Sequence, residues 1–281
     1  LHQTIGYNAY AGSTRGALGT LWDGDGNALD VASLGVALMR ASGIPATYAQ
    51  GTLTTTQAQQ LIRSMFPETY QNVGYIPNGT DVSDPASDPA LAALATPHYW
   101  FQFDAGAGLV NADPLMTATV GQSATPPTGT FTEVADALRS KTRIQVDAEI
   151  YSQAGALFGG SGLSTSTVLD LTFNDVSLVG RPLTIGNDVS TTGGGFVFTA
   201  LSHTYSPYVI VAGDSADPKD DQVVYGTDYQ EVLTNFPLGS QILTGVFLHV
   251  TLIAPDGTTT TTTKPLADRL MDKTDFYRTC A

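Results

Sequence analysis

The sequence predicts an α+β fold for the first part of the chain and a mainly-β domain for the rest. Three observations support this. Apolar residues recur at helical spacing near the N-terminus. Apolar and polar residues alternate in several segments beyond residue 140. A stretch with two adjacent prolines and no apolar periodicity, residues 121–130, separates the two patterns. We therefore expect two domains, residues 1–125 and 126–281.

The clearest predicted element is a helix over residues 27–42. Asn27 is a residue type that caps helix N-termini. Gly43 suits the position just after a helix, and Pro45 prevents continuation. The apolar positions follow one helix face: Val31, Leu34, Leu38 and Ala41.

The elements after this helix predict a short antiparallel sheet. We expect a strand over 46–53, then a helix over 55–65 opened by Thr55 or Thr56, then a polar surface loop over 78–89. Two further strands, 98–104 and 109–111, are joined by a tight Ala-Gly-Ala-Gly turn. The first helix would pack on these strands.

The remainder reads mostly as strands after a short helix over 132–141. The β-rich runs are 143–150, 168–173, 196–201, 208–212 and 246–253. The turn Pro255-Asp256-Gly257 precedes six threonines, residues 258–263, which we expect to form a returning strand with an exposed face. A β-sandwich is one possible fold for this mainly-β domain.

Composition excludes several functions. The chain has 281 residues, 26 acidic and 12 basic, and a net charge of -14, which argues against nucleic-acid binding. No apolar stretch approaches the roughly 18 residues of a membrane helix, so we expect no membrane insertion. Cys280 is the only cysteine, which rules out an internal disulfide and a cysteine-rich zinc site. We expect no metal and no cofactor.

Three ordered motifs carry a family resemblance. The first runs from Gly26 to Leu34 and continues as Leu38-Met-Arg-Ala-Ser-Gly-Ile-Pro-Ala46. The second is His98-Tyr-Trp-Phe101, and the third is Gly108-Leu-Val-Asn-Ala-Asp-Pro114. In this order and spacing they resemble bacterial transglutaminase-like domains, over about residues 8–120. The resemblance implies a papain-like core, in which a helix packs on an antiparallel sheet.

The resemblance also implies a Cys-His-Asp site. In that family a cysteine at a helix N-terminus has a lowered thiol pKa, a histidine takes its proton and an aspartate orients the imidazole. Here His98 and Asp113 match the histidine and the aspartate, while Ala28 occupies the nucleophile position. Asn27 and Trp100 match positions that support the site.

Two other positions depart from the family pattern. Thr47 stands where an arginine usually follows Gly-Ile-Pro-Ala, and Gln102 replaces the acidic residue that commonly follows His-x-Trp.

Two explanations account for Ala28. A naturally degenerate domain would be a catalytically inactive binding or structural module of a larger exported bacterial protein. A peptide, protein or glycan would then bind in the residual cleft, outside the cell or in the cell envelope. Alternatively, the native protein is an active cysteine acyltransferase or peptidase whose nucleophile was replaced by Ala28. The Thr/Ser/Gly/Asp-rich composition and the start at Leu1, without Met, favour a piece of an exported protein.

Overall fold

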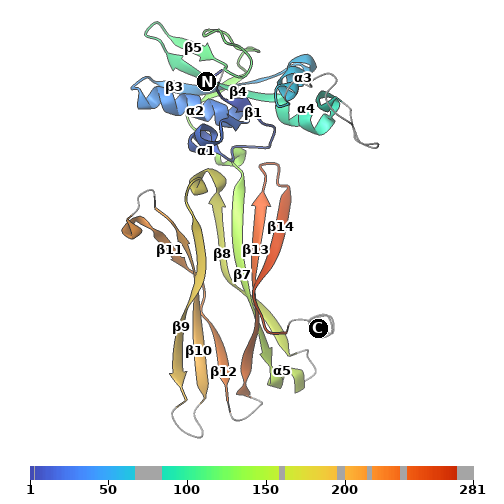
Figure 1. The fold of residues 1–281 in the computed structure, drawn as a ribbon, viewed down its shortest axis with the longest axis vertical. Coiled ribbons are helices and arrows are strands. Elements are labelled where there is room, and N and C mark those ends of the chain that lie inside the picture. Colours follow the sequence, from blue (N-terminus) through green and yellow to red (C-terminus); the bar gives the residue numbers. More distant parts are fainter. Residues whose placement is uncertain are drawn as a thin grey trace, which may run out of the picture. The chain divides into compact units, whose positions relative to one another are not determined.

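The computed structural model describes residues 1–2, 4–66, 84–157, 162–194, 200–213, 217–234 and 239–270. The chain forms two compact units (Figure 1). Unit 1 comprises Leu1–Ser140, Asn174–Val179 and Ala254–Gly257. Unit 2 comprises Lys141–Phe173, Gly180–Ile253 and Thr258–Ala281.

Helix α2, Ala28–Ala41, confirms the helix predicted over residues 27–42. The Asn27 side chain accepts a hydrogen bond from the Asp30 backbone N–H, as an N-cap should. At the other end Gly43 has a φ of +76°, a left-handed conformation that glycine adopts at low cost. Helix α1, Gly16–Asp23, precedes α2, packs beside it and was not predicted.

The sheet of unit 1 is antiparallel and has the order β5-β4-β3-β6 among the described residues. Its strands are β3 (Ala46–Thr52), β4 (Pro97–Asp104), β5 (Leu109–Ala112) and β6 (Gly129–Phe131). The first three confirm the predicted strands. Helix α2 packs closely on this sheet: a Cβ added at Gly35 would lie 2.3 Å from Cδ1 of Phe101 in β4.

The segments beside this sheet correct two predictions. Helix α3, Thr55–Arg63, begins where it was predicted and ends two residues earlier, and its cap is Thr54 rather than Thr55 or Thr56, because Thr54 and Gln57 form a reciprocal capping box. The loop prediction over 78–89 is wrong where the structure describes it. A short 3-10 turn, η1 (Pro85–Ser87), and helix α4 (Pro89–Ala95) form there because Asp84 and Asp88 cap them. Residues 78–83 lie outside the described chain.

The chain after residue 125 continues unit 1. Strand β6 pairs with β3, and the units divide after Ser140, whereas the composition changes near residue 125. The helix predicted over 132–141 is wrong: only the 3-10 turn η2, Asp136–Leu138, forms. The reason is non-local. The Ser13 N–H donates to the Leu138 carbonyl at 2.7 Å, and the Ser140 N–H donates to the Ser13 carbonyl at 3.0 Å.

Unit 2 consists mainly of long strands. They are β7 (Lys141–Ser152), β8 (Leu163–Asn174), β9 (Leu183–Gly193), β10 (Leu201–Val211), β11 (Gln222–Tyr225), β12 (Tyr229–Leu233), β13 (Gln241–Ile253) and β14 (Thr259–Asp268). The runs predicted over 143–150, 168–173 and 246–253 lie inside strands. The run 208–212 is a strand as far as Val211. Of the run 196–201, residues 196–199 lie outside the described chain.

Hydrogen bonds connect these eight strands into one sheet, in place of the two separate sheets of a simple sandwich. Strand β12 makes the connection because it pairs with the start of β10 and, through Val232, with Gln241 of β13. Strand β10 also pairs with β11, and strand β13 also pairs with β14. The threonine run forms the returning strand β14 as predicted, and its side chains are exposed on both faces.

No helix within the described ranges is long and apolar enough to cross a membrane.

Candidate functional site

The structure brings His98 and Asp113 together inside unit 1. His98 lies in β4, Asp113 directly follows β5, and His98 Nε2 is 2.9 Å from Asp113 Oδ1. Both residues are buried, with exposed fractions of 0% and 2%. The Ala124 N–H donates to the second Asp113 oxygen at 3.0 Å. Asp113 therefore lies where its carboxylate can fix the orientation of the imidazole.

The other ring nitrogen of His98 is buried and has no hydrogen-bond partner among the described residues. The Trp100 indole stacks beside this imidazole, with ring centroids 5.8 Å apart. Trp100 thus supports His98 by packing.

Asn111 is a residue of this site that the sequence analysis missed. Its Oδ1 accepts hydrogen bonds from Trp100 Nε1 at 2.9 Å and from Gln102 Nε2 at 2.8 Å. The direct pairing of Gln102 with Asn111 across β4 and β5 explains the contact. This pairing depends on strand register. The sequence signal that could have identified Asn111 is its position opposite Gln102 when the two predicted strands of the hairpin are aligned.

The two departures from the family motif are neighbours. Thr47 of β3 pairs directly with Gln102 of β4. The arginine and the acidic residue that the resemblance leads us to expect would therefore face each other across the two strands. Both are replaced here by uncharged residues, and the buried Thr47 hydroxyl has no hydrogen-bond partner among the described residues.

His98 and helix α2 lie on opposite faces of the sheet. Successive side chains of a strand point to opposite faces. His98 shares its face with Trp100 and with Gln102, which both bond to Asn111. The alternate residues of β4 face α2, as the contact between Phe101 and Gly35 shows.

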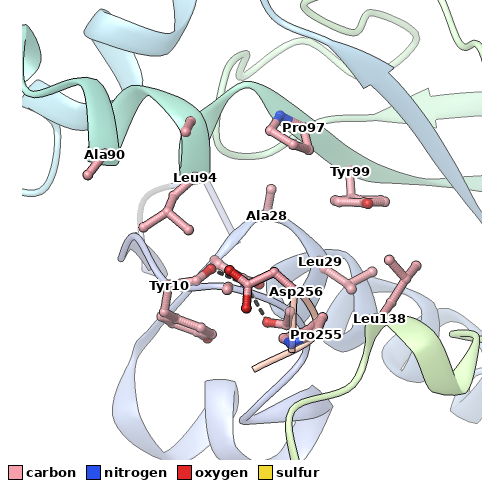
Figure 2. A pocket seen from close by; sticks show the side chains of 14 residues that line it. Tyr10, Ala28, Leu29, Ala90, Leu94, Pro97, Tyr99, Leu138, Pro255 and Asp256 are labelled. Atoms are coloured by element: carbon pink, nitrogen blue, oxygen red, sulfur yellow. Dashed lines mark hydrogen bonds between the residues drawn. The ribbon is translucent and has the colours of Figure 1, made fainter. Parts of the chain in front are cut away.

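Ala28 lines a pocket of about 500 Å³ in unit 1 (Figure 2). The lining comes from the loop before α1, the start of α2, helix α4, β4, the turn η2 and the turn at residues 254–257. It is mainly apolar and aromatic, and includes Tyr10, Leu29, Leu94, Pro97 and Tyr99. His98 and Asp113 are not among the described residues that line it. The structure therefore brings His98 together with Asp113, while Ala28 lines a pocket to which these two residues do not contribute.

Asn27 caps helix α2, as the sequence predicted, and it also makes contacts beside the pocket that the sequence did not predict. Besides capping α2, its Nδ2 donates to the Tyr10 carbonyl at 3.0 Å and to the Gly12 carbonyl at 2.6 Å. The Asn27 side chain therefore holds the loop before α1 against the N-terminus of α2.

Asp30 is a second residue that the sequence analysis missed. Its fully buried carboxylate accepts five hydrogen bonds from one loop: the Ser13 and Tyr10 hydroxyls and the backbone N–H groups of residues 14, 15 and 16, at 2.6–3.1 Å. Burial, followed by the charge of Asp30, raises the pKa of Tyr10. The sequence signal was an acidic residue within the first turn of a helix that is apolar on several faces.

Among the described residues that line the pocket there is no Ser, Thr, Cys, Lys or His side chain. Ser33 is buried further along α2, and its hydroxyl donates to the Leu29 carbonyl at 2.9 Å. Cys280 lies outside the described residues. The described part of the chain also has no group of three or more His, Cys, Asp or Glu side chains placed to hold a metal ion.

Comparison with known proteins places the first part of the chain in a family. The family model of the transglutaminase-like superfamily matches residues 1–114. Searches of curated proteins and of solved structures each found no match. The matched range includes Ala28, His98 and Asp113. Residues 1–114 therefore form a transglutaminase-like domain.

Proposed function

We propose that the transglutaminase-like domain is a non-catalytic module that binds an extended peptide, with an apolar side chain in the pocket beside Ala28. One observation carries this proposal: Ala28 lines a pocket to which neither His98 nor Asp113 contributes. Alanine cannot form a covalent acyl intermediate, and the loss of a nucleophile removes most of the rate enhancement of such a site.

The pocket lining favours an apolar group of the ligand. Among its polar members, Tyr10 donates to Asp30, Asn27 bonds to the loop backbone, and Asp256 adds one carboxylate at the turn of residues 254–257. Leu29, Leu94 and Pro97 offer apolar surface, and Tyr99 adds an aromatic ring. A glycan needs several hydrogen-bond partners, so this lining suits a peptide side chain better.

We also propose that this module serves a larger exported bacterial protein, in the extracellular space or the cell envelope. The low lysine content and the abundance of Thr, Ser, Gly and Asp support this assignment.

The retained His98–Asp113 pair favours a second candidate, a cysteine acyltransferase or peptidase whose nucleophile was replaced. The variant Ala28→Cys, made together with Cys280→Ser, separates the two candidates by its rate of alkylation with iodoacetamide at pH 6. For a binding module we expect the rate of an ordinary thiol, whose pKa is about 8.5, unchanged by His98→Ala or Asp113→Ala. Fast alkylation that falls in both variants would support the enzyme instead.

Binding itself is testable with phage that display a library of seven-residue peptides. We expect the wild-type protein to enrich apolar peptides that Ala28→Phe does not retain, because the phenyl ring fills the pocket. Ala107→Phe, at an exposed alanine of the β4–β5 turn, is the matched control and should retain them. Equal retention by Ala28→Phe, or no enrichment by the wild type, would contradict the proposal.

A further inference from the structure

The neighbouring strands β14, β13 and β7 of unit 2 (Figure 1) carry three polar side chains that contact one another in series. Thr263 Oγ1 is 2.8 Å from His249 Nδ1, and His249 Nε2 is 3.2 Å from Asp147 Oδ2. Thr263 and His249 are direct cross-strand partners, whereas Asp147 lies diagonally across β7. A hydroxyl, an imidazole and a carboxylate therefore stand in the order of a nucleophile, a base and an orienting group.

The contact with Asp147 favours one tautomer of the neutral His249 imidazole. Nε2 faces the carboxylate at 3.2 Å, and a proton on Nε2 is the one that this acceptor attracts. Nδ1 is then an acceptor, and the hydroxyl of Thr263 is the donor in the 2.8 Å contact. This is the direction of proton sharing that general-base assistance of a hydroxyl requires.

Asp147 is itself held in position. Its Oδ1 accepts hydrogen bonds from Gln145 Nε2 at 3.0 Å and from Thr167 Oγ1 at 2.8 Å. These contacts leave Oδ2 for His249. The carboxylate therefore has a defined orientation, which fixes the plane of the imidazole.

The hydroxyl is accessible while its two partners are sheltered. Thr263 is exposed, but the side chains of His249 and Asp147 are only 25% and 16% exposed. Two residues away on the same face of β14, Thr261 offers a matched comparison: its hydroxyl contacts only the Thr251 hydroxyl, at 2.9 Å, among the contacts that the structure describes. Thr261 thus has the same residue type, strand and exposure without a base.

We propose that Thr263 is an activated nucleophile that accepts acyl groups from activated esters. The Thr263 oxygen attacks the ester carbonyl carbon while its proton passes to His249 Nδ1. The carbon–oxygen bond to the leaving group then breaks, and the departing oxyanion takes the proton from His249. The products are an O-acyl threonine and the free alcohol or phenol, and His249 returns to its neutral form. This modification site is independent of the pocket beside Ala28.

The test uses the full chain and p-nitrophenyl acetate, with acetylation at each threonine measured by peptide mass spectrometry. Hydroxylamine, which cleaves esters but not amides, distinguishes acetyl-Thr263 from an acetylated Lys264. We expect acetylation of Thr263 at least tenfold faster than that of Thr261 in the same molecules, and a loss of that excess in His249→Gln. Thr261→Val should leave the Thr263 rate unchanged. Equal acetylation rates of Thr261 and Thr263 in the wild type would overturn the proposal, and this comparison does not depend on the folding of any variant. An undiminished rate at Thr263 in folded His249→Gln would overturn it as well.

Discussion

His98 Nε2 and Asp113 Oδ1 are 2.9 Å apart in a buried pair, and the opposite ring nitrogen of His98 has no hydrogen-bond partner among the described residues. The pair lies on the sheet face away from α2, whereas Ala28 begins α2 and lines a pocket to which neither residue contributes. His98 and Asp113 are therefore both part of the interior of the domain.

Removal of Asp113 should destabilise unit 1, because it leaves His98 Nε2 and the Ala124 N–H buried without an acceptor. We expect Asp113→Ala to cost about 3 kcal/mol in free energy of unfolding. His98→Leu in the same chain should recover part of this loss, with a coupling of about 1 kcal/mol or more. Both tryptophans, Trp22 and Trp100, lie in unit 1, so urea unfolding followed by tryptophan fluorescence reports on it. Strictly additive effects of the two substitutions would contradict a direct interaction.

The Asp30 carboxylate should be essential for the loop before α1. In Asp30→Asn an amide replaces one acceptor oxygen, so several of its five donors lose their partner. We expect a loss of about 3 kcal/mol in the same unfolding measurement. Asp88→Asn is the matched control, since Asp88 is an exposed N-cap and asparagine caps helices equally well. Similar stabilities of the two variants would show that the buried network contributes little.

Gly35 should be required by the close approach of Phe101. A methyl group at residue 35 would lie 2.3 Å from the ring, and overpacking of this kind costs about 1–3 kcal/mol. That cost outweighs the gain in helix propensity of about 1 kcal/mol. We expect Gly35→Ala to lower stability in the wild type, and to do so much less in a Phe101→Leu background. If the cost is equal in both backgrounds, the ring is not its cause.

Tyr7 should make unit 1 sensitive to alkaline pH. Burial raises the pKa of Tyr7 from 10.0 to about 12. Below pH 10 the phenol is neutral in both states, so its contribution to stability is complete there. As the pH rises from about 10 to about 12, the unfolded chain loses this proton while the folded chain retains it, and stability falls. Tyr7→Phe should flatten this fall between pH 10 and 11, while both proteins show the same slope between pH 7 and 9. A steep alkaline fall that persists in Tyr7→Phe would assign it to another group.

Local patterns predicted the parts of unit 1 that local interactions stabilise. Helix α2 follows from its apolar face, Asn27 and Gly43, and the hairpin of β4 and β5 follows from two strands around a glycine-rich turn. The failures have non-local causes. Residues 132–141 do not form a helix because the Ser13 backbone bonds to this segment. Strand β6 returns to β3 beyond the point where the composition changes.

The sequence by itself determined the family of residues 1–114, the positions of Ala28, His98 and Asp113 in the motif, and the absence of a nucleophile at residue 28, because these depend on residue identity and spacing. Only the tertiary structure decided that Ala28 lines a pocket to which His98 does not contribute, that Asp30 holds the loop before α1, and that Thr263, His249 and Asp147 meet on one face. Each of these depends on strand register or on chain folding over long sequence separations. A shift of register by one residue would move every side chain of a strand to the other face.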